Sequence, residues 1–307
     1  MSNVSQHLAS GALSGFVSSI CLQPLDLLKT RIQQGDGKRR SHVVLVTAYD
    51  VVHKEGFFAL WRGTTATLLR NIPGVALYFT SLNHVRSSLG RLPYFATARI
   101  SPNGHAQTHQ GSVLPKLTSQ GNLIAGATTR VAVGVVLNPF AVLKARYESN
   151  LYKYQSLAGA VQSLVRAGPT ELFRGVLASS LRDAPYAGLF VVLYERIKTD
   201  MTSLFIPLSS GHHLMVHAYA GMVAGGIATL VTHPFDVIKT KMQVRQEDKY
   251  HSMLKTVAVI WRQRGARGFF DGAALRMTRK PLSSAIGWAV YEGTLMFMHS
   301  QPQSLSL

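Results

Sequence analysis

The chain has 307 residues, and its 32 lysines and arginines against 14 aspartates and glutamates give a net charge of +18. Its one cysteine, Cys21, excludes an internal disulfide and a zinc site built from several cysteines. The sequence contains no nucleophile elbow, phosphate-binding loop or metal-ligand cluster. We therefore expect neither an enzyme nor a protein with a bound metal or cofactor.

Six apolar stretches are each long enough to cross a bilayer, which takes roughly 20 helical residues. In chain order they cover residues 7–33, 70–89, 119–147, 178–199, 214–242 and 276–298. Each stretch has polar residues at helical spacing on one face, as Ser10, Ser14 and Ser18 are in the first. In a membrane such a face must turn toward a bundle interior or a water-filled cavity. The sequence thus predicts an all-helical membrane protein with six transmembrane helices around a polar cavity.

One motif occurs three times, at intervals of about 100 residues. The copies are Pro24-x-Asp26-x-x-Lys29-x-Arg31, Pro139-x-Ala141-x-x-Lys144-x-Arg146 and Pro234-x-Asp236-x-x-Lys239-x-Lys241. A period this long is not that of a solenoid. We expect one transmembrane domain made of three repeats, residues 1–89, 116–200 and 213–300. A flexible connector at 90–115 and a second connector at 201–212 would join them.

The prolines of the three motifs, Pro24, Pro139 and Pro234, predict a bend near the end of each odd-numbered helix. Proline removes an amide donor and pushes on the carbonyl four residues back. Three bent helices can converge, and three-fold repetition lets the acid of one motif meet the base of another. We expect the converged ends to be held together in a ring.

Small residues recur at fixed distances before two of the motifs. Gly11 and Gly15 precede Pro24 by the same intervals as Gly221 and Gly225 precede Pro234, which is typical of close helix packing. In the middle repeat Gly126 keeps the first place, but Arg130 occupies the second. Arg130 is therefore a candidate for an added cation in the cavity.

A second pattern follows each motif: an acidic residue and glycine, then an aromatic residue, a basic residue and glycine. It is complete in Glu55-Gly56 and Trp61-Arg62-Gly63, and altered in Ala167-Gly168 with Phe173-Arg174-Gly175 and in Arg264-Gly265 with Phe270-Asp271-Gly272. With these motifs, residues 5–298 resemble the mitochondrial carrier family. The resemblance implies a pseudo-three-fold bundle with short matrix helices in the mitochondrial inner membrane, moving one solute by alternating access. The first ten residues contain no secretory signal or arginine-rich presequence, so we expect internal targeting.

The resemblance implies a matrix gate formed by the motif charges Asp26, Lys29, Lys144, Asp236 and Lys239. Asp26 would pair with Lys144, and Asp236 with Lys29. Because Ala141 replaces the acid of the second motif, Lys239 would lack its usual gate partner. The residues nine places after the prolines, Gln33 and Gln243, match the bracing glutamines of the family, and Glu148 takes this place in the middle repeat.

The resemblance also implies a cytoplasmic gate on the even-numbered helices, at Asn83, Arg86, Glu195, Lys198 and Glu292. Here the family pattern is degraded, because cyclic pairing leaves one ionic pair, Glu292 with Arg86. Glu195 would face Leu295. We therefore expect the substrate-free carrier to rest open toward the cytoplasm, held by the stronger matrix gate.

Alignment of the even-numbered helices on their Tyr-Glu positions brings Arg70, Arg182 and Arg279 to one level. The residues that follow, Asn71, Asp183 and Lys280, break the symmetry. In the family, an arginine and acid pair at this place on the fourth helix goes with amino-acid substrates. A zwitterion needs a cation for its carboxylate and an anion for its ammonium group. Arg182 and Asp183 are therefore the leading substrate contacts, with Arg70, Arg279, Asn71 and Arg130 as further candidates.

The charge pair alone indicates a small amino acid. The runs at residues 181–189, 23–33 and 144–149 are similar to those of the family branch that carries glycine for haem synthesis, so glycine is the leading expectation. Another small amino acid or a carboxylate remains an alternative.

The net charge also admits a basic protein that binds nucleic acid or a membrane surface. Its cations are scattered, with one run at Lys38-Arg39-Arg40, so we expect no nucleic-acid partner. Anionic lipid explains the surplus better. The resemblance implies cardiolipin at helix N-termini beside Gly56, Gly63, Gly168, Gly175, Gly265 and Gly272. We expect a monomer.

Overall fold

The computed structural model of the protein describes residues 3–35, 43–92, 94–95, 117–152, 154, 156–204 and 210–300. Within these ranges every regular element is a helix, which confirms the predicted class. The basic run at 38–40 and nearly all of the connector expected at 90–115 lie outside the described residues. The same holds for much of the connector expected at 201–212.

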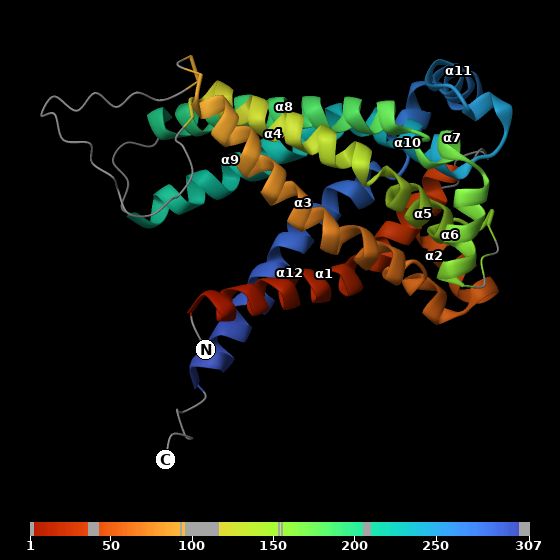
Figure 1. The fold of residues 1–307 in the computed structure, drawn as a ribbon, viewed down its shortest axis with the longest axis horizontal. Helices are drawn as coiled ribbons and strands as arrows, with labels where there is room; N and C mark the ends of the chain where they lie inside the picture. The colour runs from red at the N-terminus through yellow and green to blue at the C-terminus, as the bar shows by residue number, and fades with distance from the viewer. Residues whose placement is uncertain are drawn as a thin grey trace, which may run out of the picture. The chain divides into compact units, whose positions relative to one another are not determined.

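The longer helices are α1 (Asn3–Gln34), α3 (Thr64–Gly90), α4 (Ser119–Val136), α8 (Val176–Leu204), α9 (Ser210–Val231) and α12 (Ala273–Ser300). The shorter α-helices are α2 (Val43–Glu55), α5 (Asn138–Glu148), α6 (Leu157–Arg166), α7 (Pro169–Leu172), α10 (His233–Val244) and α11 (Met253–Arg264). Three 3-10 helices, η1 (Phe57–Trp61), η2 (Asp248–Tyr250) and η3 (Gly265–Phe270), complete the described elements (Figure 1).

The helices form two compact units, each with segments from all three expected repeats. The first unit consists of Met1–Arg70, Phe140–Arg174 and Thr240–Leu307, and the second of Asn71–Pro139 and Gly175–Lys239. The boundaries fall within α3, α5 and α10 and between α7 and α8. No single repeat is therefore a compact body by itself.

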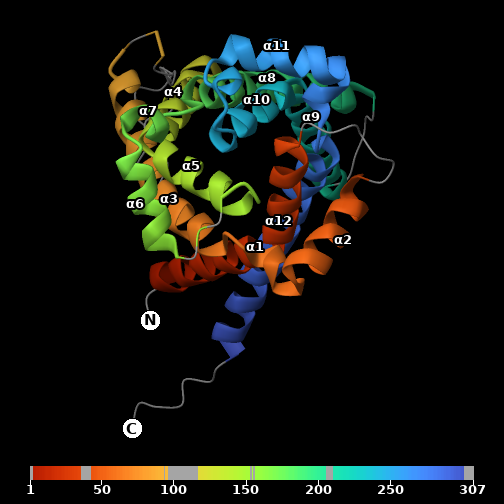
Figure 2. The same ribbon diagram turned by 90° about the vertical axis from the view of Figure 1, so that its right-hand side faces the viewer.

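In the first unit α1 packs along α12, as Figures 1 and 2 show. The polar face predicted for the first stretch lies in this contact. The Ser14 hydroxyl donates a hydrogen bond of 2.7 Å to the carbonyl of Gly287, and Ser10 and Ser18 are buried. A Cβ atom at Gly287 would lie 3.4 Å from Ser14 Oγ, so glycine lets the two helices approach closely.

In the second unit α8 packs against both α4 and α9 (Figure 1). Tyr186, Phe190 and Tyr194 of α8 stack in a column, with ring centroids 6.2 and 6.0 Å apart, and His217 of α9 stacks on Tyr194. Their spacing of four residues places them on one face of the helix. This column stiffens the α8 face that points to the cavity described below.

Two of the three motif prolines lie at pronounced bends. The helix axes of α4 and α5 differ by 64° around Leu137, just before Pro139. Those of α9 and α10 differ by 51° around Thr232, just before Pro234. At Pro24 the helix continues unbroken from Asn3 to Gln34. Pro24 therefore does not divide α1 into two helices, whereas the breaks before Pro139 and Pro234 separate α4 from α5 and α9 from α10.

Length and apolarity identify several membrane spans among the described residues. Two segments qualify alone, Ser10–Gln34 and Pro169–Met201, and the bent pairs α4–α5 and α9–α10 qualify if each is one span. The remaining two of the six expected helices, α3 and α12, have 27 and 28 residues, enough to cross a bilayer, but are less apolar. Their polar residues include the arginines of the predicted substrate level.

The last base of each motif connects one repeat to the next within the first unit. Arg31 Nε donates to the carbonyl of Glu148 at 2.7 Å, and Arg146 Nε to that of Gln243 at 3.1 Å. Lys241 Nζ donates to the carbonyl of Gly35 at 2.9 Å. Carbonyls at a helix C-terminus lack intrahelical donors, and the dipole there favours cations. The ring expected from the sequence is therefore closed by bonds to the ends of the motif helices.

The acidic and basic residues of the tail patterns pair in ways that explain their departures from the family pattern. In the first tail Glu55 binds Arg31 through both oxygens and lies 3.6 Å from Arg62. In the third tail Arg264 and Asp271 form an ion pair with the two charges exchanged. The third repeat thus departs from the family pattern in sequence but retains the ion pair between these two positions.

In the second tail, which has Ala167 where the acid is expected, Glu171 supplies the negative charge. It pairs with both Arg146 and Arg174. Every repeat therefore has an ion pair at its tail, although only the first matches the family pattern.

Acidification tests the Arg31–Glu55 contact. The two hydrogen bonds from Arg31 hold the pKa of the Glu55 carboxyl below its ordinary value of 4.5. Because the folded-state pKa is the lower one, the stabilisation is complete above pH 4.5 and is lost as the pH falls below it. At pH 7 we expect Glu55→Gln to reduce the free energy of unfolding by roughly 1–3 kcal/mol.

Thermal unfolding of the purified protein in mild detergent at pH 7 and pH 3.5 would measure this difference. The gap between wild type and Glu55→Gln should narrow at the lower pH. An equal gap at both values would show that the ionised Glu55 does not stabilise the fold.

Candidate substrate and gate sites

Asp26 and Lys144 form an ion pair in the first unit, with 2.7 Å between Oδ2 and Nζ. Asp26 lies two residues after Pro24 on α1, and Lys144 lies five residues after Pro139 on α5. Their side chains are 10 and 14 % exposed. This is the pairing that the repeat symmetry predicts, and it joins the first motif directly to the second.

Glu148 gives Lys144 a second carboxylate. Its Oε1 lies 3.5 Å from Lys144 Nζ, one helical turn away on the same helix. The Thr30 hydroxyl and the Gln23 amide also donate to Glu148, at 2.6 and 3.1 Å. Asp26 and Glu148 therefore share Lys144, an arrangement that a glutamine at position 148 would not give.

Asp26 also binds Arg279 of α12. Arg279 Nη2 donates to Asp26 Oδ2 at 3.1 Å, and Arg279 Nε pairs with Oδ1. The carboxylate therefore has a cation on each side, Lys144 from α5 and Arg279 from α12. The sequence predicted Arg279 as a substrate contact, and the structure places it on the predicted gate acid.

Arg182 and Asp183 of α8 form the most complete ion pair of the second unit. Arg182 Nε and Nη2 donate to the two oxygens of Asp183 at 2.8 and 3.0 Å. The remaining Nη1 donates to Asp236 Oδ1 of α10 at 3.0 Å. Asp236 is only 2 % exposed, so its charge depends on such a partner. Two carboxylates thus share one guanidinium.

A cavity of about 440 Å³ lies in the second unit between α3, α4 and α8. Its wall includes Tyr78, Gly126, Arg130, Tyr186 and Glu195. This volume is in the range of small-molecule sites, and the wall combines aromatic surface with a few charges. A Cβ atom at Gly126 would meet nothing within 4 Å, so this glycine borders the cavity and does not pack closely as the sequence suggested.

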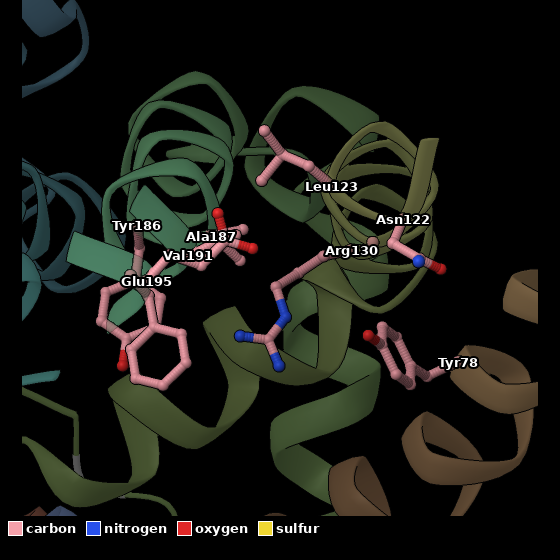
Figure 3. A pocket seen from close by; sticks show the side chains of 10 residues that line it. Tyr78, Asn122, Leu123, Arg130, Tyr186, Ala187, Val191 and Glu195 are labelled. Carbon is pink, nitrogen blue, oxygen red and sulfur yellow. The ribbon is translucent and has the colours of Figure 1, made fainter. Parts of the chain in front are cut away.

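Figure 3 shows Arg130 extending from α4 into this cavity, between Tyr78 and the residues of α8. Its guanidinium carbon lies 5.7 Å from the centre of the Tyr78 ring, a cation–π distance. Arg130 and Lys239 are close enough to Asp183 for their charges to act on its carboxylate. The cavity therefore has a cation in its wall within the electrostatic reach of the Arg182–Asp183 pair.

The bracing residues lie among backbone groups of the first unit. The Gln33 amide donates to the carbonyl of Asp271 at 3.2 Å and accepts from the Thr240 hydroxyl at 2.7 Å. The Gln243 amide donates to the carbonyl of Arg174 at 3.4 Å. Both glutamines are buried.

Only some contacts of the predicted cytoplasmic gate residues lie within one of the two units. In the second unit Arg86 donates to Asn122 of α4, and Glu195 borders the cavity. Asn83, Lys198 and Glu292 are exposed on their helices. The pairs Glu292–Arg86 and Asp236–Lys29 join residues of different units and stay predictions.

Two further substrate candidates, Arg70 and Asn71, lie half-buried on α3 at the boundary of the two units. Their substrate role stays a prediction. Tyr78 and Tyr186, which line the cavity, were not predicted as site residues. Their spacing could have indicated them, because Tyr78 follows Asn71 by two helical turns and Tyr186 follows Arg182 by about one.

The six glycines expected to bind cardiolipin share one backbone property. Gly56, Gly63, Gly168, Gly175, Gly265 and Gly272 all have φ between 61 and 94°, a region that other residues rarely adopt. Each lies at the start of a helix or 3-10 helix. The turn geometry alone therefore requires glycine at these places, and cardiolipin binding stays a prediction.

The comparison with known proteins agrees with this architecture. The family model described as mitochondrial carrier protein matches residues 1–92, 115–204 and 210–301, and the chain belongs to this family. It is accordingly a transporter and not an enzyme, and a multi-pass membrane protein of the mitochondrion.

Relatives over nearly the full length share one description. The chain is 61 % identical to a mitochondrial glycine transporter of Laccaria bicolor, over 98 % of this chain and 99 % of the relative. It is 43 % identical to one of Aspergillus clavatus, over 94 and 88 % of the two chains. It is 39 % identical to one of Mycosarcoma maydis, over 93 and 82 %.

The shared lysine generates a prediction for Glu148→Gln. When Glu148 is neutralised, Asp26 is the one carboxylate of this pair that still attracts Lys144, and the repulsion between the two carboxylates is removed. We expect this variant to hold the Asp26–Lys144 pair more firmly and to transport roughly fivefold more slowly, with unchanged or higher thermal stability. Uptake into proteoliposomes and thermal unfolding would measure the two effects.

Glu148→Ala is the matched control, because it also leaves Gln23 and Thr30 without their acceptor. It should lower the free energy of unfolding by about 1–3 kcal/mol. Faster transport by Glu148→Gln than by wild type would contradict the shared-lysine interpretation.

Proposed function

We propose that this protein carries glycine across the mitochondrial inner membrane into the matrix by alternating access. Supporting this proposal are its membership of the carrier family and its 61 % identity to a mitochondrial glycine transporter over nearly the whole chain. The observation that carries the substrate assignment is the Arg182–Asp183 pair on α8, one helical turn before Tyr186 and Ala187 of a cavity wall that contains a further cation, Arg130. A supply role in haem synthesis is a prediction from the family resemblance.

An amino acid can replace the internal ion pair without leaving a net charge in the membrane. Its carboxylate would take the place of Asp183 on Arg182, and its ammonium group would take the place of Arg182 on Asp183. Two charge-assisted contacts are exchanged for two others, so neither Arg182 nor Asp183 is left without an opposite charge. The small size of glycine lets both ends reach neighbouring residues of one helix.

Arg130 would attract the carboxylate during entry. It lies in the cavity wall, backed by the Tyr78 ring, which supports the guanidinium without neutralising it. A cation in a cavity with apolar walls raises the local concentration of anionic groups. Asp183 provides the opposite charge nearby, which favours a zwitterion over a simple anion.

Alternating access needs a gate on each side of the site. The Asp26–Lys144 pair and the bonds from the three motif bases support a closed matrix side in the substrate-free protein. The cytoplasmic gate residues offer fewer opposite charges. We therefore infer that the resting carrier is open toward the cytoplasm.

The same site could hold another small amino acid, and a carboxylate carrier is the second candidate. The two candidates differ at Asp183. A substrate without an ammonium group would take Arg182 and leave the Asp183 charge without its partner, which costs free energy in a site of low polarity. The side-chain volume of larger amino acids would have to fit against Tyr186 and Ala187.

Cardiolipin and oligomeric state belong to the same proposal. The six positive-φ glycines each stand at the start of a helix, where the first backbone amides have no partner within the helix, which supports lipid binding there. We infer a monomer as the transporting form.

Reconstitution of the purified protein in cardiolipin-containing liposomes tests the substrate. Wild type should take up labelled glycine, and Arg182→Ala and Asp183→Ala should each reduce uptake at least a hundredfold, because each leaves one charge of the substrate and one of the protein unpaired. Arg196→Ala is the matched control, since Arg196 is exposed on the same helix. Its uptake should match wild type.

Thermal unfolding separates loss of the site from loss of the fold, and all variants should unfold within a few degrees of one another. Normal uptake by both site variants would refute the site. Transport of a dicarboxylate or nucleotide in place of glycine by wild type would refute the amino-acid assignment.

A further inference from the structure

Two arginines of the predicted substrate level hold the acids of the predicted matrix gate. In the second unit Arg182 of α8 donates to Asp236 of α10 at 3.0 Å. In the first unit Arg279 of α12 donates to Asp26 of α1 at 3.1 Å and makes a second contact through Nε. The same kind of link therefore occurs in both units, between one even-numbered and one odd-numbered helix.

The links follow one rule of the three-fold repeat. The arginine of the second repeat reaches the motif acid of the third, and the arginine of the third reaches the motif acid of the first. The equivalent of Asp26 and Asp236 in the second repeat is Ala141, which has no carboxylate. Two of the three repeat interfaces can therefore form this link, whereas the third cannot form it in the same way.

We propose that Arg182 and Arg279 are positioning residues that hold the gate acids Asp236 and Asp26 in the closed arrangement, and that substrate binding releases Asp236 by taking Arg182. The part concerning Arg182 rests on the proposed function. The part concerning Arg279 needs no substrate contact. The same guanidinium, that of Arg182, would thus bind the substrate and hold the gate acid.

The geometry of Asp26 shows what Arg279 contributes. Asp26 Oδ2 accepts from both Lys144 and Arg279, and Oδ1 pairs with Arg279. A guanidinium that contacts both oxygens fixes the carboxylate plane, so that Oδ2 stays directed at Lys144. Arg279 is 34 % exposed and Asp26 only 10 %, so the arginine approaches from the more open side.

The geometry of Arg182 provides the coupling to substrate. Three of its five N–H donors are used, two on Asp183 and one on Asp236. A substrate carboxylate that takes Arg182 competes with both of these acceptors. The substrate ammonium group can replace Arg182 at Asp183, but the substrate has no second cation to replace Arg182 at Asp236. The free energy of binding is therefore directed against the contact of Asp236, which weakens the closed state as substrate arrives.

A single cysteine can report the opening of the matrix side. Cys21→Ser removes the native thiol, and Ala187→Cys places a small thiol in the cavity wall, five residues after Arg182. Impermeant thiol reagents would be applied to mitoplasts for cytoplasmic access and to inverted inner-membrane vesicles for matrix access. The labelling rates are compared without substrate.

In this background Arg279→Gln should raise matrix-side labelling roughly tenfold, because Asp26 is no longer held toward Lys144. Arg279→Lys keeps the charge and should restore part of the slow labelling. The half-saturation constant for glycine should change less than twofold. Arg267→Gln, an exposed arginine of η3, is the matched control and should label like the parent.

Unchanged matrix labelling in Arg279→Gln would overturn the proposal. A rise in the half-saturation constant with unchanged labelling would assign Arg279 to substrate binding instead. These outcomes are independent of the glycine assignment, because no substrate is present during labelling.

Asp236→Asn tests the coupling at Arg182. Without the competing carboxylate of Asp236, the substrate carboxylate binds Arg182 more readily, so the half-saturation constant for glycine should fall about threefold. Glycine should also no longer accelerate matrix-side labelling. Asp248→Asn, which neutralises an exposed carboxylate of η2 that is not a gate residue, should leave the half-saturation constant unchanged. An unchanged half-saturation constant in Asp236→Asn would refute the coupling, whereas normal uptake by Arg182→Ala would refute the substrate site itself.

Discussion

Charges inside a membrane protein must find partners, and in this chain the partners of the motif charges come from another repeat. Arg31, Arg146 and Lys241 each bind a backbone carbonyl near the end of the next motif helix, and Lys144 binds Asp26. A lysine or arginine left alone in this environment would be costly, so the repeats cannot separate here without replacing these bonds. The contacts that join the motif helices of the first unit can therefore be exchanged for others.

This constraint also explains why departures from the family pattern are tolerated. Arg264 and Asp271 keep their ion pair with the charges exchanged, and Glu171 supplies the acid that Ala167 does not. Glu148 is different, because it adds a carboxylate where a neutral amide would serve. It gives Lys144 a partner on its own helix, which remains available when α1 and α5 move apart. We therefore expect Glu148 to weaken the closed state and to stabilise the open state.

The sequence predicted much of this arrangement, since a triplicated motif specifies both the helices and the cyclic pairing of their charges. The ring of motif ends follows from the triplicated spacing, and the Asp26–Lys144 pair follows from the resemblance to the carrier family. The contacts of Arg182 and Arg279 with Asp236 and Asp26 did not follow, because alignment of even-numbered helices gives the level of a side chain and not its direction.

The most direct test of this account is whether Asp26 and Lys144 act as one gate. Asp26→Asn, Lys144→Gln and the double variant would be compared by the rate at which the thiol of Ala187→Cys is labelled from the matrix side without substrate. If the two charges act through each other, either single variant raises labelling roughly tenfold and the double variant labels no faster than the faster single. If the two effects multiply in the double variant, the residues act independently and the account is wrong.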